Sequence, residues 1–134
     1  MPTKNTPAYH LSIAERHLDK VRAAWDDPTD WADLTTYGLY CVEALVHAAG
    51  VAVGLSTVKT HWQKVGMAET LHTHHGLTDV SGLMRDLNEG RKANAYGDSE
   101  FDNSDLDAEE IANAIEEFFD EVGEFVASQG REDT

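Results

Sequence analysis

The chain lacks the features of a disulfide-rich or membrane-spanning protein. Its 134 residues include one cysteine and three prolines. Cys41 cannot form an internal disulfide and lies in an apolar run, which favours a core position and a reducing compartment. The longest apolar region, 39–55, is interrupted by Glu43 and His47 and is too short to span a bilayer. No apolar segment typical of a signal peptide opens the chain, so we expect a cytoplasmic protein with no membrane association.

Basic residues are scarce, and the shortage is concentrated towards the C-terminus. The chain has 10 Lys and Arg against 25 Asp and Glu, a formal net charge of −15. Residues 98–134 carry 1 of the basic residues and 14 of the acidic ones. Such a segment repels phosphate, which argues against general binding of duplex DNA but allows a local basic pocket elsewhere. Three interpretations stay open: a solvated helix face, a halophilic source, or a docking surface for a basic partner.

Helical periodicity dominates the chain, in which 41% of residues are hydrophobic, and no run combines strand alternation with hairpin signals. We predict an all-α fold, an up-and-down bundle of four to five helices in one domain (1–134), with a core of about 8–128 and a loose acidic tail at 129–134. The predicted helices cover about Pro7–Trp25, Trp31–Ala49, His61–Leu71 or slightly beyond, Thr78 or Ser81 to Gly97, and Asp107–Gly130. A polar loop is predicted at 97–104.

Side-chain size and spacing indicate which faces are buried. The second helix carries small residues, such as Gly38 and Ala48, that allow neighbours to approach closely, so we expect it to be central. The tryptophans, Trp25, Trp31 and Trp62, are interpreted as packing residues. The last helix is expected to bury the apolar residues that share one of its faces, which are Ile111, Ile115, Phe118, Phe119, Val122, Phe125 and Val126.

Arg91 is the first candidate site residue. The inward stripe Val80, Met84, Leu87 reaches Arg91 after four more residues. A buried, unpaired charge is costly, so this arginine is expected to pair with an acid such as Glu43, to extend to solvent at the helix end, or to line a pocket.

Glu43 lies in a polar stripe with Tyr40 and His47 on an otherwise apolar helix. If that stripe faces Arg91, the four groups form one polar pocket. The alternative is that the stripe faces water.

The histidines His61, His72, His74 and His75 are numerous enough to suggest a metal site. Their segment ends at Gly76 and lacks a clear acid or cysteine partner. We therefore expect neither a physiological metal nor a cofactor.

Three segments carry a family resemblance that covers roughly residues 10–128. They are TTYGLYCVEALVHAAG, LMRDLNEGRKANAYGDSEF and, after an acidic linker, AEEIANAIEEFFDEVGEFV. Together they resemble the second helix and the C-terminal half of HEPN domains. The resemblance implies a helical bundle that dimerises through its central helices. Many HEPN domains are metal-independent ribonucleases of toxin–antitoxin, defence or RNA-processing systems, whereas others bind RNA or nucleotides, or partner a minimal nucleotidyltransferase.

The family motif is Arg, four to six residues, then His. Arg91 matches the arginine and Lys92 the polar residue that often follows it, with Asn94 nearby, but Tyr96 stands in the histidine position. RNA cleavage through the 2′-hydroxyl needs a base and an acid, and histidine suits both near neutral pH. Tyrosine titrates near 10, about three units too high for a base at pH 7.

The replacement of the motif histidine by Tyr96 favours a non-catalytic homodimer that binds RNA, a nucleotide or a partner protein. The expected binding residues are Arg91, Lys92, Asn94 and Tyr96, with Glu43, His47 and Tyr40 nearby. One alternative is a ribonuclease that uses Arg91 with Tyr96. Another is a structural adaptor that binds through its acidic last helix. In some HEPN pairs the nucleotidyltransferase adenylylates a tyrosine near the motif, and Tyr96 is a candidate for this modification.

Overall fold

A computed structural model describes residues 6–26, 28–96 and 106–132. Within these ranges the chain forms helices joined by short connections, and no strand is present. The predicted all-α bundle is therefore confirmed. No helix in the described ranges is both long and apolar enough to cross a membrane. The predicted polar loop, 97–104, lies outside the described residues. The helices are α1 (Pro7–Ala24), α2 (Trp31–Ala52), α3 (His61–His75), α4 (Ser81–Tyr96) and α5 (Ala108–Glu132).

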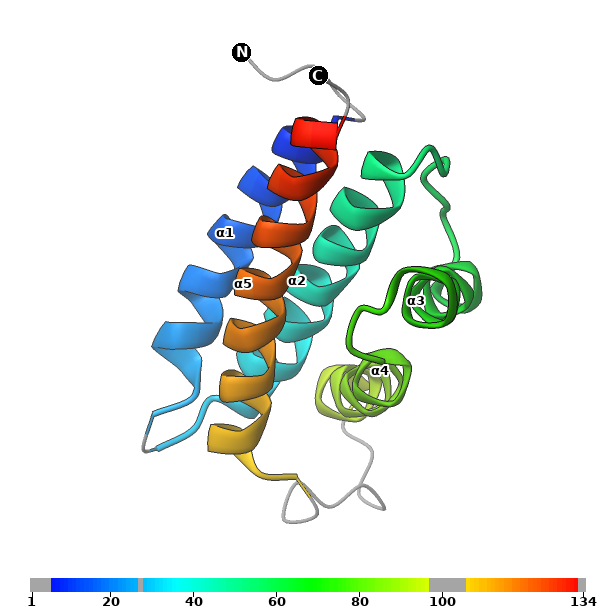
Figure 1. Cartoon of the computed structure of the whole chain (residues 1–134). Helices are drawn as coiled ribbons and strands as arrows, with labels where there is room; N and C mark the ends of the chain where they lie inside the picture. The colour runs from blue at the N-terminus through cyan, green and yellow to red at the C-terminus, as the bar shows by residue number, and fades with distance from the viewer. Residues whose placement is uncertain (1–5, 27, 97–105, 133–134) are drawn as a thin grey trace.

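The helices lie in two groups (Figure 1). Helices α1, α2 and α5 run side by side, with α1 opposite in direction to the other two. Helices α3 and α4 are seen end-on in the same view, so they cross the first group. Helix α2 contacts each of the other four. This confirms its predicted central place.

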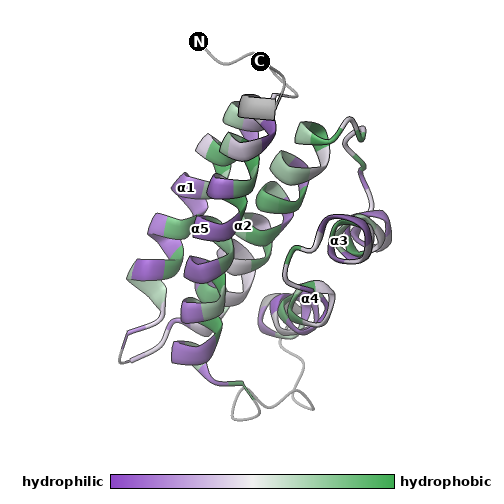
Figure 2. Ribbon diagram, in the orientation of Figure 1, coloured by the Kyte–Doolittle hydropathy of each residue, from purple (hydrophilic) through white to green (hydrophobic). Residues whose placement is uncertain are grey.

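Burial extends around most of α2. Leu34, Val42 and Leu45 are fully buried, and so are the small residues Ala48 and Ala49. Figure 2 shows the helix green, hence hydrophobic, over most of its length. A helix that is apolar on nearly every side is stable only when other elements cover it. The small residues let those elements approach, as the sequence predicted.

Helix α5 covers the bundle with one face, and its predicted core residues lie on that face. Ile111, Ile115, Phe118 and Val122 are buried. Phe119, Phe125 and Val126 are partly buried and pack against the same core.

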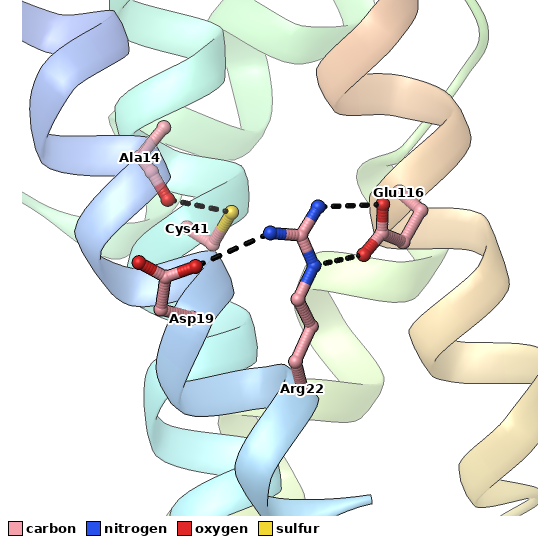
Figure 3. Close-up of polar contacts among 5 residues, drawn as sticks. All are labelled: Ala14, Asp19, Arg22, Cys41 and Glu116. Carbon is pink, nitrogen blue, oxygen red and sulfur yellow. Dashed lines mark hydrogen bonds and ion pairs between the residues drawn. The ribbon is translucent and has the colours of Figure 1, made fainter.

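The outer surfaces of α5 and α1 are joined by a two-pronged ion pair (Figure 3). Arg22 donates from Nε and Nη2 to the two carboxylate oxygens of Glu116, and from Nη1 to Asp19 at 3.2 Å. The pair is half exposed, so it contributes at most about 1 kcal/mol. Its two parallel bonds fix the register of α5 against α1.

Cys41 occupies the core position predicted for it. Its thiol lies 3.4 Å from the carbonyl oxygen of Ala14, to which it donates (Figure 3). Burial raises the pKa of the thiol to about 12, with a smaller contribution from Glu116. Because the thiolate is the reactive form, this cysteine is inert in the folded protein.

Several helix ends match the sequence signals. Thr6, Asp30 and Asp107 each accept a hydrogen bond from the backbone N–H three residues later. Thr60 and Gln63 add a reciprocal capping box at the start of α3, which the sequence analysis did not identify.

The sequence predicted that Gly50 and Gly54 mark the end of α2 and that Gly130 ends α5. Gly54 is confirmed, because α2 ends at Ala52 and Gly54 follows with φ 88°. Gly50 and Gly130 are wrong, since both lie inside their helices and α5 continues to Glu132. A glycine ends a helix when the chain there turns left-handed. Among the described residues only Gly54 and Gly76 have positive φ. Gly50 instead gives Met67 room, because a Cβ at this position would lie 2.7 Å from the methionine sulfur.

At Gly38, α2 lies close to both α4 and α5. A Cβ added there would lie 3.1 Å from Ile115 Cδ1 and 3.5 Å from Leu87 Cδ2. Gly38→Val is therefore expected to overpack the core and lower the free energy of unfolding by about 1–3 kcal/mol.

Gly66 in α3 has open space around its Cβ position, so Gly66→Ala is expected to raise the free energy of unfolding by about 0.5–1 kcal/mol. Urea unfolding followed by circular dichroism measures both changes, and wild-type stability of Gly38→Val would contradict this account of the packing.

Candidate functional site

Helices α3 and α4 form an antiparallel pair. Residues 76–80 connect them, and Gly76 ends α3 in the left-handed conformation with φ 74°. Two interactions between side chains of α3 and α4 show that the helices run in opposite directions. Arg85 pairs with Glu69 at 3.0 Å, and Arg91, further along α4, acts electrostatically on His61 at the start of α3. The first turn of α3 therefore lies beside the last turns of α4.

A mostly buried ion pair joins this place to α2. Nζ of Lys64 lies 3.5 Å from Oε1 of Glu43, and their side chains retain 19% and 13% exposure. Glu43 thus faces α3, and the described residues show no ion pair between Glu43 and Arg91. Removing either partner would leave a buried charge uncompensated.

Arg91 continues the inward stripe as predicted. Val80, Met84 and Leu87 are buried, and Arg91 is half-buried at the end of the stripe. Its Nη2 donates to Oδ1 of Asn88 at 3.0 Å. Its Nε is buried and has no hydrogen-bond partner among the described residues. A buried donor of this kind is costly unless water or a ligand accepts its proton.

His61 is the centre of the charged group. Burial lowers the pKa of its imidazole, Glu43 opposes that shift, and the charges of Lys92, Lys64 and Arg91 lower the pKa further. Its Nδ1 is buried without a partner in the described part of the chain. The imidazole is therefore neutral near pH 7, and three cations and one carboxylate act on it.

Trp62 adds an aromatic surface at the same place. Its side chain is 73% exposed, and its ring lies 6.0 Å from that of His61. The prediction that Trp62 serves packing is wrong. Trp62 lies three residues before the buried Val65, and this spacing marks an inward position, so no sequence signal indicated its exposure. We call the surface formed by His61, Trp62, Lys64, Arg91 and Lys92 the α3–α4 edge.

His47, on α2, lies within electrostatic reach of Lys64 of this edge. Its Nε2 accepts the backbone N–H of Val58 at 3.3 Å, and its ring lies 5.4 Å from that of His10. Burial lowers the pKa of His47 to about 4, with help from His10 and Lys64. His10, which the sequence analysis did not identify, is buried, its pKa is lowered by burial, and its Nε2 has no described partner.

The other predicted site residues are dispersed. Tyr40 is 39% exposed and packs near His17 and Tyr37 at the contact of α1 and α2. The stripe of Tyr40, Glu43 and His47 therefore does not form one pocket with Arg91.

Three predicted residues occupy the end of α4. Lys92 is exposed, and Nδ2 of Asn94 donates to the carbonyl oxygen of Gly90 at 2.7 Å. Tyr96 is the last residue of α4, and its side chain lies outside the described part of the structure.

The histidines of α3 do not gather around one point. His72 Nδ1 lies 2.8 Å from the carbonyl oxygen of Leu77, and the ring of His75 packs against Phe125. His61 lies at the opposite end of the helix. Within the described residues no group of three histidine, cysteine or carboxylate side chains is arranged to hold a metal.

Comparisons with protein-family models, with curated proteins and with solved structures each found no match. The α3–α4 edge therefore has to be interpreted from its own chemistry.

The buried histidines predict a pH dependence of stability. His47 is neutral in the folded state down to about pH 4, whereas an unfolded histidine takes up a proton near 6.5. The unfolded chain therefore binds more protons between pH 6.5 and 4, and the contribution of His47 to stability is lost as pH falls through that window. His47→Gln keeps an acceptor for Val58 without titrating. Urea unfolding from pH 7 to 4.5 should show a shallower decline for this variant than for wild type, while exposed His74→Gln follows wild type. Equal slopes for His47→Gln and wild type would contradict this assignment.

Proposed function

We propose that this chain is a HEPN-like, non-catalytic module that binds single-stranded RNA at the α3–α4 edge. The observation that carries the proposal is the exposed Trp62 next to His61, on which the charges of Arg91 and Lys92 act. Bases stack on exposed aromatic rings, and arginine and lysine contact the intervening phosphates. In this proposal the module belongs to a toxin–antitoxin or defence system, as the family resemblance implies.

The local charge supports an anionic ligand despite the net charge of −15. Of the three cations that act on His61, Lys64 is neutralised by Glu43, which leaves Arg91 and Lys92. Two phosphate contacts imply modest affinity, with log K falling by about 1.4 per unit of log salt concentration.

Two buried polar atoms beside the edge have no described hydrogen-bond partner. Nε of Arg91 and Nδ1 of His61 lack described partners. Phosphate oxygens are strong acceptors for guanidinium N–H groups, since the bond is charge-assisted. Trp62 is 73% exposed, and stacking on an exposed ring suits an extended strand better than an enclosed small molecule.

The proposal excludes catalysis because Tyr96 takes the motif histidine position. A tyrosine near pKa 10 stacks or donates a hydrogen bond readily, but it is a weak base at pH 7. Tyr96 therefore belongs with the binding residues in this scheme.

Binding is tested with a fluorescently labelled single-stranded 12-nucleotide RNA in 50 mM salt, by anisotropy. Trp62→Ala is expected to weaken binding about 5-fold or more, since stacking contributes about 1–3 kcal/mol per base. Arg91→Ala should also weaken it, and Trp62→Phe should retain most of the affinity.

Arg85→Ala is the matched control for Arg91→Ala, because Arg85 lies on the same helix but pairs with Glu69. Lys92→Ala should also weaken binding, and Lys20→Ala, an exposed lysine on α1, is its control. Thermal unfolding checks that each variant is folded. Wild-type affinity in Trp62→Ala, or no binding by wild type, rules out the proposal. Competition by a mononucleotide at equal concentration would make the ligand a nucleotide.

A second candidate function is a metal-independent ribonuclease, and His61 favours it. The motif lacks a histidine after Arg91, but α3 supplies one within electrostatic reach of the arginine. Its lowered pKa leaves the imidazole neutral at pH 7, the form a general base needs.

Cleavage of a total-RNA and tRNA panel in chelator separates the two functions. A nuclease predicts cleavage that is lost in both Arg91→Ala and His61→Ala and retained in Arg85→Ala. Our first proposal predicts intact RNA with all four proteins.

The homodimer and the minimal nucleotidyltransferase partner belong to the same proposal. Light scattering across a concentration series measures the mass of the assembly. Incubation with a co-expressed nucleotidyltransferase, followed by intact-mass spectrometry of wild type and Tyr96→Phe, tests modification of Tyr96.

A further inference from the structure

A groove lies away from the α3–α4 edge, between α5 and the start of α4. Its volume is about 560 Å³, and it is lined by the connection before α4, by the first half of α4 and by α5. Along α5 its lining runs from Asp107 to Glu121 on one stripe. Fourteen residues of α-helix span about 21 Å, so the groove is elongated along the helix axis.

The groove has an apolar floor. Val80 and Phe118 are buried there, and Leu83, Leu106 and Ala114 are partly exposed. Partly exposed aliphatic side chains in a concave surface gain free energy when an apolar partner covers them.

The rim of the groove is acidic. Asp86, Glu110 and Glu117 line it, and the described residues show no hydrogen bond or ion pair to their carboxylates. Three further carboxylates there have structural roles: Asp79 caps α4, Asp107 caps α5, and Glu121 accepts from Thr78. The described lining contains no lysine or arginine.

We propose that this groove docks a basic amphipathic helix of a partner protein. The apolar residues of the helix, spaced i, i+3 or i+4 and i+7, would cover Leu83, Ala114 and Leu106. Its lysines or arginines would meet Asp86, Glu110 and Glu117. An elongated apolar floor with charges along its edges is the arrangement by which grooves recognise amphipathic helices. The unpaired carboxylates indicate that the charge of the partner helix is positive.

Other occupants match the groove less well. RNA is repelled by the carboxylates. The neighbouring segment of the same chain, 97–105, contains four acidic residues and no basic residue, so its charge does not complement the rim. The groove is also separate from the α3–α4 edge, so this inference does not depend on RNA binding.

The probe is a labelled synthetic 14-residue helical peptide with leucines at i, i+3 or i+4 and i+7 and lysines on either side of that stripe. Fluorescence anisotropy measures its affinity for the full chain. The matched peptide has the same composition in a scrambled order without an apolar stripe. We expect the amphipathic peptide to bind at least about 10-fold more tightly, and its helical circular dichroism to increase on binding.

Paired variants separate the groove from net charge. Glu110→Gln with Glu117→Gln removes two charges from the rim, whereas Asp120→Asn with Glu124→Gln removes two from α5 outside the groove lining. The rim variant should weaken binding about 5-fold or more, and the outer variant should change it less than 2-fold. Both pairs are solvent-accessible substitutions, and thermal unfolding confirms their fold.

Four results would overturn the inference. Equal losses in the two charge variants, or equal affinity of the scrambled peptide, would reduce the interaction to general charge attraction. Displacement of the peptide by spermine at equal positive charge would have the same meaning. Self-association of wild type that is abolished by the rim variant would make the occupant a second copy of this chain.

Discussion

The structure depends on covering α2. This helix is apolar on nearly all sides, so it is stable in water only when the other four helices pack against it. Small residues such as Gly38 and Gly50 set how close those helices come, and side chains of α4, α5 and α3 fill the space that a Cβ would occupy. The positions of the α3–α4 edge and of the acidic groove follow from this packing, because both lie where neighbouring helices of α2 meet.

Charges of opposite sign lie on the two surfaces that α4 helps to form. Arg91 and Lys92 lie at its C-terminal end beside the start of α3, whereas Asp86 and the cap residue Asp79 face α5 near its N-terminal end. Coulomb interactions between exposed charges fall off within about 8–10 Å in physiological salt, so one small helical protein can present an anion-binding surface and a cation-binding surface that act separately. Of the three interpretations of its acidity, docking of a basic partner is the one that the groove supports.

Local signals predicted much of the fold. The start of α1 at Pro7, the break before Trp31 and the end of α3 at Gly76 follow from proline, aspartate and glycine chemistry that acts within a few residues. Predictions failed where the residue that gave the local signal is present for tertiary packing instead. Gly50 reads as a helix end, but it is buried and accommodates Met67. Gly130 lies within α5, which continues to Glu132.

The sequence by itself determined the all-α class, the central helix, the inward stripe that carries Arg91 and the acidity of the C-terminal segment, because each is a property of spacing or composition within one segment. Only the tertiary structure decided which side chains contact one another. It paired Glu43 with Lys64 in place of Arg91, separated Tyr40 from His47, and brought His61 to the end of α4. It also left Trp62 in solvent although its spacing marks an inward position. Periodicity states which face of a helix is apolar, whereas the crossing of the helices decides which residues meet across that face and which extend past it.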